Sequence, residues 1–426
     1  MSFHSVVGMQ EACLGWENGM TEIDIEDKIS KFWGIKCSAL EIEQQIELDE
    51  ILDNLSNNKF TNAEKNNPIS AFKFASWLNT ENLKNFFKKD SYKNFDIVEK
   101  RLGPRIRFIA AMCLGKYETI IDTYRTMIAN EFWNILGFST PPTYEILREF
   151  INERIGVERL QEFFDFLIIE LIRQAKLNNI HLGRRIGQDA TDTVCLKYDK
   201  EAKYSGYYKH EGYKVDVVHD LDDPTVPLDY TPMNLVDDEG KNLIPAQERL
   251  RQKGISIEEQ KVDGSYVKSY ENIAKSETKG TRLIYKIQDG WVYNEKGTEE
   301  NVKRVYQKYH NEDGFKVNAN KNFMLNFLCK KYEYYVVGAY YRNQRMTYTV
   351  NNPELAKKEI GERSCKTEGY FSVEKGTTIL DSRPRRRGRR EFIRRCGISM
   401  LSHIFAALIR IQHGIKTALG CVTYIT

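Results

Sequence analysis

The fold class is decided by three stretches: RRIGQDATDTVCLKY (184–198), GYKVDVVHDL (212–221) and VPLDYTPMN (226–234). Each alternates apolar with polar residues and is rich in β-branched ones, which is typical of β-strands joined by short polar turns. The chain then continues with a predicted helix at 243–253, a strand ending in KVDG (261–264), a helix near 266–276 and the strand TRLIYKI (281–287). This order predicts a mixed sheet flanked by helices, an α/β (mixed α+β) fold.

Residues 1–180, in contrast, are predicted to be helical. Helical spacing of apolar residues is found at 25–33 and 41–55, and it continues in more apolar segments further on. Thr140, which is followed by proline, predicts a helix start, and Gly156 is expected to separate two helices. We therefore expect an all-helical region before the sheet.

The regular order is interrupted over 288–360. The run YEYYVVGAYYRNQRMTYTV (332–350) is strongly β-prone, and we expect it to form a hairpin that turns near Asn343 within a mostly β insertion. Helical spacing returns at 354–375 and at 391–413. The chain would thus divide into four parts, at residues 1–180, 181–287, 288–360 and 361–426.

Composition excludes several classes of protein. Of 426 residues, 41% are hydrophobic and 29% are charged, with a formal net charge of +3, so the chain is neither disordered nor collagen-like. Its eight cysteines include no Cys-x-x-Cys pair, which favours free thiols in a reducing compartment. The start lacks the pattern of a signal peptide, and the longest apolar stretch, 398–412, is too short to span a bilayer. We expect a soluble, cytoplasmic protein without a membrane partner.

Three acidic positions stand out by their context. Asp189 lies inside the first predicted strand, Asp263 ends a strand before a tight turn, and Glu368 lies on a predicted helix with Lys375 on the same face two turns later. Carboxylates from separate elements that converge at a mixed sheet suit Mg²⁺. Asp192 is a rival for the first position, because residues three apart on a strand point to opposite faces and cannot both line one site.

These residues resemble the DDE transposases of bacterial insertion sequences, through Asp-Ala-Thr at 189–191, Asp-Gly-Ser-Tyr at 263–266 and Glu-x6-Lys from 368 to 375. The resemblance is clearest over 183–287 and 362–413. It implies an RNase H-like catalytic domain with a mostly β insertion before the catalytic Glu, preceded by a helical region that binds DNA ends and pairs subunits.

The motif that contains Glu-x6-Lys has a second half in the family, and that half is altered in this chain. The family's usual pattern sets an Arg four residues before the Glu and a Tyr three residues before that Arg. Here Ser364 and Gly361 stand at those places, and Arg363 lies one position early. Glu362 and Glu374 are nearby rivals of Glu368.

The resemblance implies a catalytic and metal-binding set of Asp189, Asp263 and Glu368 with two Mg²⁺ ions, for which Mn²⁺ is a possible substitute. Such a site would cleave phosphodiester bonds at the ends of the element and transfer the freed 3′-OH ends to target DNA. The partner would be double-stranded DNA, at transposon ends and target, and two subunits would act as a homodimer.

DNA contacts are expected around this set. Lys375 and Arg363 would contact DNA near the cut, and Trp291 could stack on a displaced base. The basic run that begins in DSRPRRRGRR should meet the DNA backbone, since Arg suits bidentate phosphate contact. Its members are Arg383, Arg385, Arg386, Arg387, Arg389, Arg390, Arg394 and Arg395.

Two other functions remain open from the sequence. A catalytically inactive or domesticated DNA-binding derivative would keep the fold and lose the chemistry. A metal-dependent nuclease of the same fold would cut DNA without joining it.

Overall fold

The computed structural model describes residues 68–89, 95–287, 334–380, 384 and 386–422. The chain divides into two compact units, Met1–Asn66 and Asn67–Thr426, and the second contains all of the described residues. The helices predicted at 25–33 and 41–55 lie outside the described residues, as does the 288–333 part of the predicted insertion.

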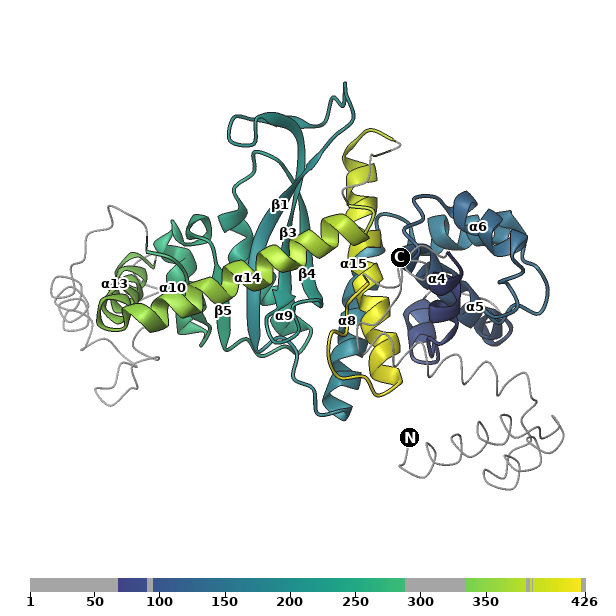
Figure 1. The fold of residues 1–426 in the computed structure, drawn as a ribbon, viewed down its shortest axis with the longest axis horizontal. Coiled ribbons are helices and arrows are strands. Elements are labelled where there is room, and N and C mark those ends of the chain that lie inside the picture. Colours follow the sequence, from purple (N-terminus) through teal and green to yellow (C-terminus); the bar gives the residue numbers. More distant parts are fainter. Residues whose placement is uncertain (1–67, 90–94, 288–333, 381–383, 385, 423–426) are drawn as a thin grey trace, which may run out of the picture. The chain divides into compact units, whose positions relative to one another are not determined.

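A mixed sheet forms the centre of the second unit (Figure 1). β3 pairs antiparallel with β1 on one side and with both β2 and β4 on the other. β5 runs parallel to β1, and β6 runs parallel to β5. The mixed α/β fold expected from the sequence is therefore confirmed, although the short β2 was not predicted. The bounds are β1 (Arg185–Val194), β2 (Lys203–Ser205), β3 (His210–Asp220), β4 (Pro227–Asn234), β5 (Glu259–Val262) and β6 (Arg282–Ile284).

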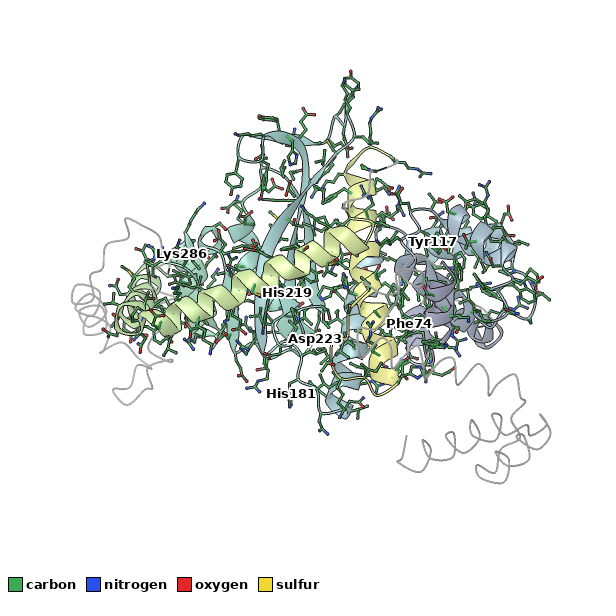
Figure 2. All side chains as sticks on the ribbon, viewed as in Figure 1. Phe74, Tyr117, His181, His219, Asp223 and Lys286 are labelled. Atoms are coloured by element: carbon green, nitrogen blue, oxygen red, sulfur yellow. The ribbon has the colours of Figure 1, made fainter. Side chains whose placement is uncertain are left out.

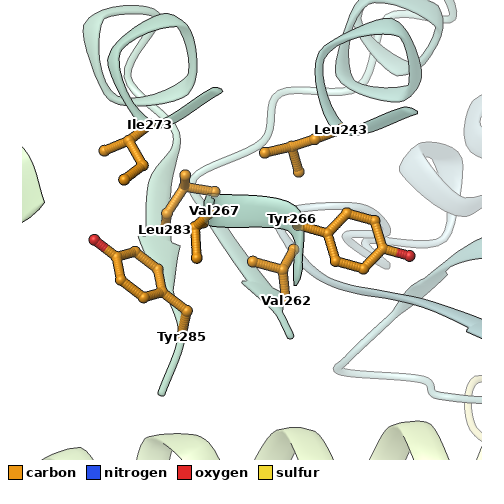
Figure 3. Packing of buried hydrophobic residues seen from close by; sticks show 7 residues of the cluster. All are labelled: Leu243, Val262, Tyr266, Val267, Ile273, Leu283 and Tyr285. Carbon is orange, nitrogen blue, oxygen red and sulfur yellow. The ribbon is translucent and has the colours of Figure 1, made fainter. Parts of the chain in front are cut away.

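Helices connect the later strands, as predicted for these segments. The 3-10 helix η4 (Glu239–Asn242) and α9 (Leu243–Gln252) lie between β4 and β5, while η5 (Gly264–Val267) and α10 (Tyr270–Thr278) lie between β5 and β6. Their apolar sides pack on the sheet and exclude water, which fixes the end of β5 and the residue that follows it. These helices and strands form a cluster of buried apolar residues (Figure 3). It consists of Leu243, Val262, Tyr266, Val267, Ile273, Leu283 and Tyr285.

The described chain before the sheet is helical, as expected. Gly156 adopts a positive φ of 57° at the end of the π-helix η3 and separates it from α8, as predicted. The predicted helix start at Thr140 is wrong, because Thr143 is the residue whose hydroxyl accepts a hydrogen bond from the backbone N–H of Ile146. The elements are α4 (Pro68–Ser76), η2 (Leu83–Lys89), α5 (Phe95–Leu114), α6 (Ile120–Ala129), α7 (Tyr144–Glu149), η3 (Phe150–Ile155) and α8 (Leu160–Leu177).

The helix α15 (Arg389–Gln412) joins these helices to the sheet. Among the described residues it is the one helix long and apolar enough to cross a membrane, but 89% of that apolar stretch is buried inside the fold. At Gly397 a side chain would collide with Leu160 of α8, so glycine permits the close approach of the two helices. α15 is thus a core helix.

The run predicted as a hairpin is the α-helix α13 (Tyr335–Asn351). Gly338 rests on the backbone of α10, where an added Cβ would come within 2.2 Å of the Tyr270 carbonyl oxygen. Arg342 lies 4.0 Å from the centre of the Tyr270 ring and donates a hydrogen bond to the Val267 carbonyl. This packing overrides the β propensity of the run, which depends strongly on tertiary context. The described part of the predicted β insertion is therefore helical.

The long helix α14 (Pro353–Thr377) crosses one face of the sheet (Figure 1). His219 of β3, labelled in Figure 2, lies at this face with its Nε2 atom 3.0 Å from the Thr367 hydroxyl of α14. The His219 ring also stacks on Tyr370, with 5.1 Å between ring centres. Further along the helix, Glu362 pairs with Lys261 of β5. These contacts fix which side chains α14 presents to the strands.

Candidate active site

Two of the predicted acidic residues lie side by side on neighbouring strands. β1 and β5 are parallel, and their register pairs Gln188 with Val262. The next residues along the chain are Asp189, still in β1, and Asp263, directly after the end of β5, and they lie close together because neighbouring strands are about 4.8 Å apart. The sequence prediction that these two residues converge is supported by this register.

The side chain of Arg363, from α14, contacts both carboxylates. Its Nη1 atom lies 3.2 Å from Asp189 Oδ2, and its Nη2 atom lies 3.9 Å from Asp263 Oδ1. The side chains of Arg363 and Asp189 are partly buried, 17% and 29% exposed, whereas about half of the Asp263 side chain is exposed (53%). The guanidinium thus balances the charge of the acid pair, a role that the sequence did not indicate.

Burial raises the pKa of the Asp189 carboxyl to about 6, and the charges of Asp263 and Glu239 act in the same direction, while Arg363 acts against them. Glu239, at the start of η4, forms a 2.6 Å ion pair with Lys214. Glu239 could not be predicted from the sequence, because nothing in its polar loop distinguishes it from other surface acids. A carboxyl group with a raised pKa beside a second carboxylate is a candidate for catalysis.

Asp189→Asn is expected to stabilise the fold at neutral pH. Because the folded-state pKa is raised, Asp189 contributes stability below its ordinary value of 3.8, and this contribution is lost as the pH rises through about 6. Asparagine resembles the neutral acid. We therefore expect the free energy of unfolding to rise by about 1–2 kcal/mol near neutral pH and by much less at acidic pH. Urea-induced unfolding at both pH values measures it. An equal change in the free energy of unfolding at both pH values would contradict a raised pKa for Asp189.

Glu368 stands apart from the acid pair. Its side chain is exposed, and it makes no hydrogen bond or ion pair with the described residues. It follows Arg363 by five residues, which turns it about 140° away around the helix axis. No three His, Cys, Asp or Glu side chains in the described part of the chain come close enough to hold a metal ion. The structure thus brings two of the three predicted ligands together.

The two rivals of Glu368 are engaged by the fold. Glu362 forms ion pairs of 2.5 Å with Lys261 and 2.6 Å with Arg185. Although burial opposes its charge, the hydrogen bonds from its cationic partners lower the pKa of Glu362 to about 2. Glu374 is fully buried 2.5 Å from His403 of α15. Both acids therefore hold α14 in place.

Lys375 contacts the first strand at the rival acid. Its Nζ atom lies 3.4 Å from Asp192, which also lies 2.8 Å from the ring of His210. Burial opposes the charge of Asp192, but its contacts with His210 and Lys375 lower its pKa. Asp189 and Asp192, predicted not to line one site together, contact different residues of α14: Arg363 lies beside Asp189, and Lys375 lies beside Asp192.

Part of the basic run is held against the segment that follows β1. Arg387 donates a hydrogen bond through Nε to the Lys197 carbonyl, and the backbone N–H of Arg389 donates to Glu201. Arg386, Arg387, Arg389 and Arg390 are exposed. Arg390 pairs with Glu158 in an exposed ion pair. Arg383, Arg385 and Trp291 lie outside the described residues.

The last two arginines of the run make contacts within the fold. Arg395 is buried and donates hydrogen bonds to the carbonyls of Ile379 and Leu380, which holds the end of the α14 segment against α15. Arg394 forms a 2.6 Å ion pair with Glu391 one turn earlier. The expectation that Arg395 meets DNA is therefore wrong, because its guanidinium is buried against backbone carbonyls.

The acid pair has donors that suit a magnesium ion. Mg²⁺ is commonly bound by one or two carboxylates, with water and substrate phosphate oxygens completing its shell. Asp189 and Asp263 supply two such carboxylates, and Arg363 now provides the positive charge between them. The pair fits one ion if Arg363 moves away. A second ion would require Glu368 or another acid to approach.

Comparison of the chain with protein-family models, with curated proteins and with solved structures finds no match in any of the three.

Proposed function

We propose that the chain is a DDE-type DNA transposase with an RNase H-like catalytic domain, as its resemblance implies. The observation that carries the proposal is the proximity of Asp189 on β1 to Asp263, the residue directly after the parallel strand β5, with Arg363 in contact with both carboxylates. The strand order also supports it. β1, β3 and β4 form an antiparallel meander, and β5 and β6 extend the sheet parallel to β1, an arrangement that suits an RNase H-like domain.

In this proposal Asp189 and Asp263 hold Mg²⁺, with Mn²⁺ as a possible substitute. The bound ion would supply Lewis-acid activation for hydrolysis at the DNA ends and for attack by the freed 3′-OH. Arg363 keeps the two aspartates paired until DNA and metal arrive, and its guanidinium then turns to a phosphate. Glu368 is the candidate ligand for a second ion, and it would hold that ion only in an arrangement that brings its carboxylate to the acid pair.

The remaining roles follow from this placement. Lys375 neutralises a phosphate close to the cut after leaving Asp192, and the exposed arginines at the start of α15 contact the DNA backbone. The helical region before the sheet binds the ends of the element. Two copies of the chain act together in the cytoplasm, because two DNA ends must be joined.

The second candidate is a catalytically inactive DNA-binding derivative. It is favoured by the ion pairs of Arg363 with the two aspartates and by the separation of Glu368 from them. Such a protein would bind the element's ends and leave them uncut.

The experiment that separates these functions uses the gene with its flanking DNA as substrate, because an insertion element carries its ends beside its transposase gene. Purified protein and Mg²⁺ are incubated with this DNA and a target plasmid. We expect cleavage at two bounded ends and joined products. Binding without cleavage in Mg²⁺ or Mn²⁺ would establish the inactive derivative, and unspecific cutting without joining would establish a nuclease.

The third carboxylate is tested by comparing Glu368→Ala with Glu239→Ala in this assay. We expect Glu368→Ala to lower cleavage and joining roughly a hundredfold or more, because a metal position is then without its ligand. Glu239→Ala should lower them less than about tenfold, since Glu239 acts on Asp189 only through its charge. The reverse order would assign the third position to Glu239.

A further inference from the structure

A β-ribbon extends past the rest of the sheet next to the acid pair, and we call it the tyrosine ribbon, residues 195–211. It runs from the end of β1 through β2, which pairs antiparallel with the start of β3. The turn between them is closed by a hydrogen bond from the Lys209 N–H to the Ser205 carbonyl. In Figure 1 this segment projects at the top of the view, above the label of β1.

The ribbon carries all of the exposed tyrosines among the side chains that the structure describes. Tyr198, Tyr204 and Tyr207 are 72%, 60% and 86% exposed, whereas the other described tyrosines are buried or half-buried. Large aromatic side chains are usually covered in a folded protein, so three exposed ones within ten residues indicate a contact surface.

Positive charge accompanies these tyrosines. The four lysines of the ribbon are exposed, at positions 197, 200, 203 and 209. Two of its three acids instead face the start of α15, where Asp199 accepts a hydrogen bond from the backbone N–H of Gly388 and Glu201 from that of Arg389. These carboxylates satisfy backbone donors at the helix start that lack intrahelical partners. They also hold the exposed arginines of α15 beside the ribbon.

The base of the ribbon is tied to the candidate active site. Asp192 of β1 lies 2.8 Å from His210 at the start of β3, and the same carboxylate is reached by Lys375 of α14. Asp189 lies three residues earlier on β1, which is about 10 Å along a strand. A DNA strand bound at the acid pair is therefore within reach of the base of the ribbon.

We propose that the tyrosine ribbon binds the single-stranded DNA that borders the cut, with Tyr198, Tyr204 and Tyr207 stacking on unpaired bases. Its lysines, together with the exposed arginines of α15, contact the phosphates of the same strand. Aromatic side chains interleaved with cations are the combination that single-stranded DNA requires, because every base has a face on which an aromatic ring can stack. This inference rests on the proposed function and adds the part of the chain that holds the opened strand.

The test measures binding of the full chain to two fluorescent DNAs in EDTA, a duplex with a single-stranded flank and the same duplex with blunt ends. The tyrosine variant replaces Tyr198, Tyr204 and Tyr207 by Ala. We expect it to bind the flanked DNA about tenfold or more weakly and the blunt duplex with little change. Leu177→Ala is the control, because Leu177, on α8, is as exposed as Tyr198, at 72%.

The charge is tested with Lys200→Gln and Lys203→Gln together, against Lys357→Gln and Lys358→Gln on an exposed part of α14. For the flanked DNA, the slope of log affinity against log salt should become shallower by about 0.7 for each phosphate that the protein no longer neutralises. The control pair should leave the slope unchanged.

Unchanged affinity of the tyrosine variant for flanked DNA would overturn the proposal. So would a shift of that variant to a smaller oligomer in light scattering with unchanged DNA affinity, since the ribbon would then join two copies of the chain. Because binding is measured without metal, the result is independent of cleavage. Weak binding by the variants would support the ribbon even if the wild-type chain cut no DNA.

Discussion

Asp263→Asn is expected to abolish metal-dependent DNA cleavage and joining, with rates at least roughly a thousandfold below those of the wild type. The substitution keeps the size of the side chain and removes one of the two adjacent negative charges that would hold Mg²⁺. The Asp263 side chain is half exposed and caps no backbone N–H, so the fold should be little affected. Cleavage of DNA that contains the element's ends, measured at saturating protein, gives the rate.

The matched control is Glu271→Gln, which removes an exposed charge on α10. It should cleave at the wild-type rate. DNA binding in EDTA should be the same for the wild type and both variants, because neither change touches the basic surface. Near-wild-type cleavage by Asp263→Asn would remove the acid pair from the mechanism.

Glu374→Ala is expected to be the most destabilising single change of those considered, at about 3–5 kcal/mol. Glu374 and His403 are both fully buried, and the His403 ring also lies 2.6 Å from the Gly420 carbonyl. The Thr378 hydroxyl lies 2.7 Å from the backbone carbonyl oxygen of Glu374 and 3.2 Å from its carboxylate, so its single hydrogen is shared with or directed to one of these two acceptors. Removing the carboxylate therefore leaves buried polar groups without a partner and opens a cavity between α14 and α15.

Glu368→Ala is the matched control on the same helix. Its side chain is exposed and makes no described contact, so its removal should change the free energy of unfolding by less than about 0.5 kcal/mol. Urea-induced unfolding of both variants measures the difference. A destabilisation below about 1 kcal/mol for Glu374→Ala would mean that the buried pair does not hold the two helices together.

Most strands of the sheet could be predicted from the sequence, because β1, β3 and β4 carry an alternating pattern of their own, whereas the three residues of β2 are too few to show one. α13 could not. Its residues have high β propensity, and its helical form depends on packing against Tyr270 and Val267, which lie more than sixty positions earlier. The helix start at Thr143 was missed for a local reason, since two threonines near the prolines offered the same capping chemistry.

The acid pair could be predicted because Asp189 lies in a strand and Asp263 lies directly after one, and both strands show a clear sequence pattern. The partner of the pair could not, since the side of α14 that faces the sheet is set by contacts such as that of Thr367 with His219. These contacts turn Arg363, and not Glu368, toward the aspartates. The proposed role of Glu368 therefore depends on a movement of α14 that the sequence pattern does not reveal.

The most direct test of the account is strand joining from a pre-cut end. A duplex that finishes at the element's terminus with a free 3′-OH is mixed with wild-type protein, Mg²⁺ and a supercoiled plasmid. We expect covalent joining of the duplex to the plasmid by the wild-type protein, and none by Asp189→Asn or Asp263→Asn. Tight binding of the duplex with no joined product in either Mg²⁺ or Mn²⁺ would contradict it.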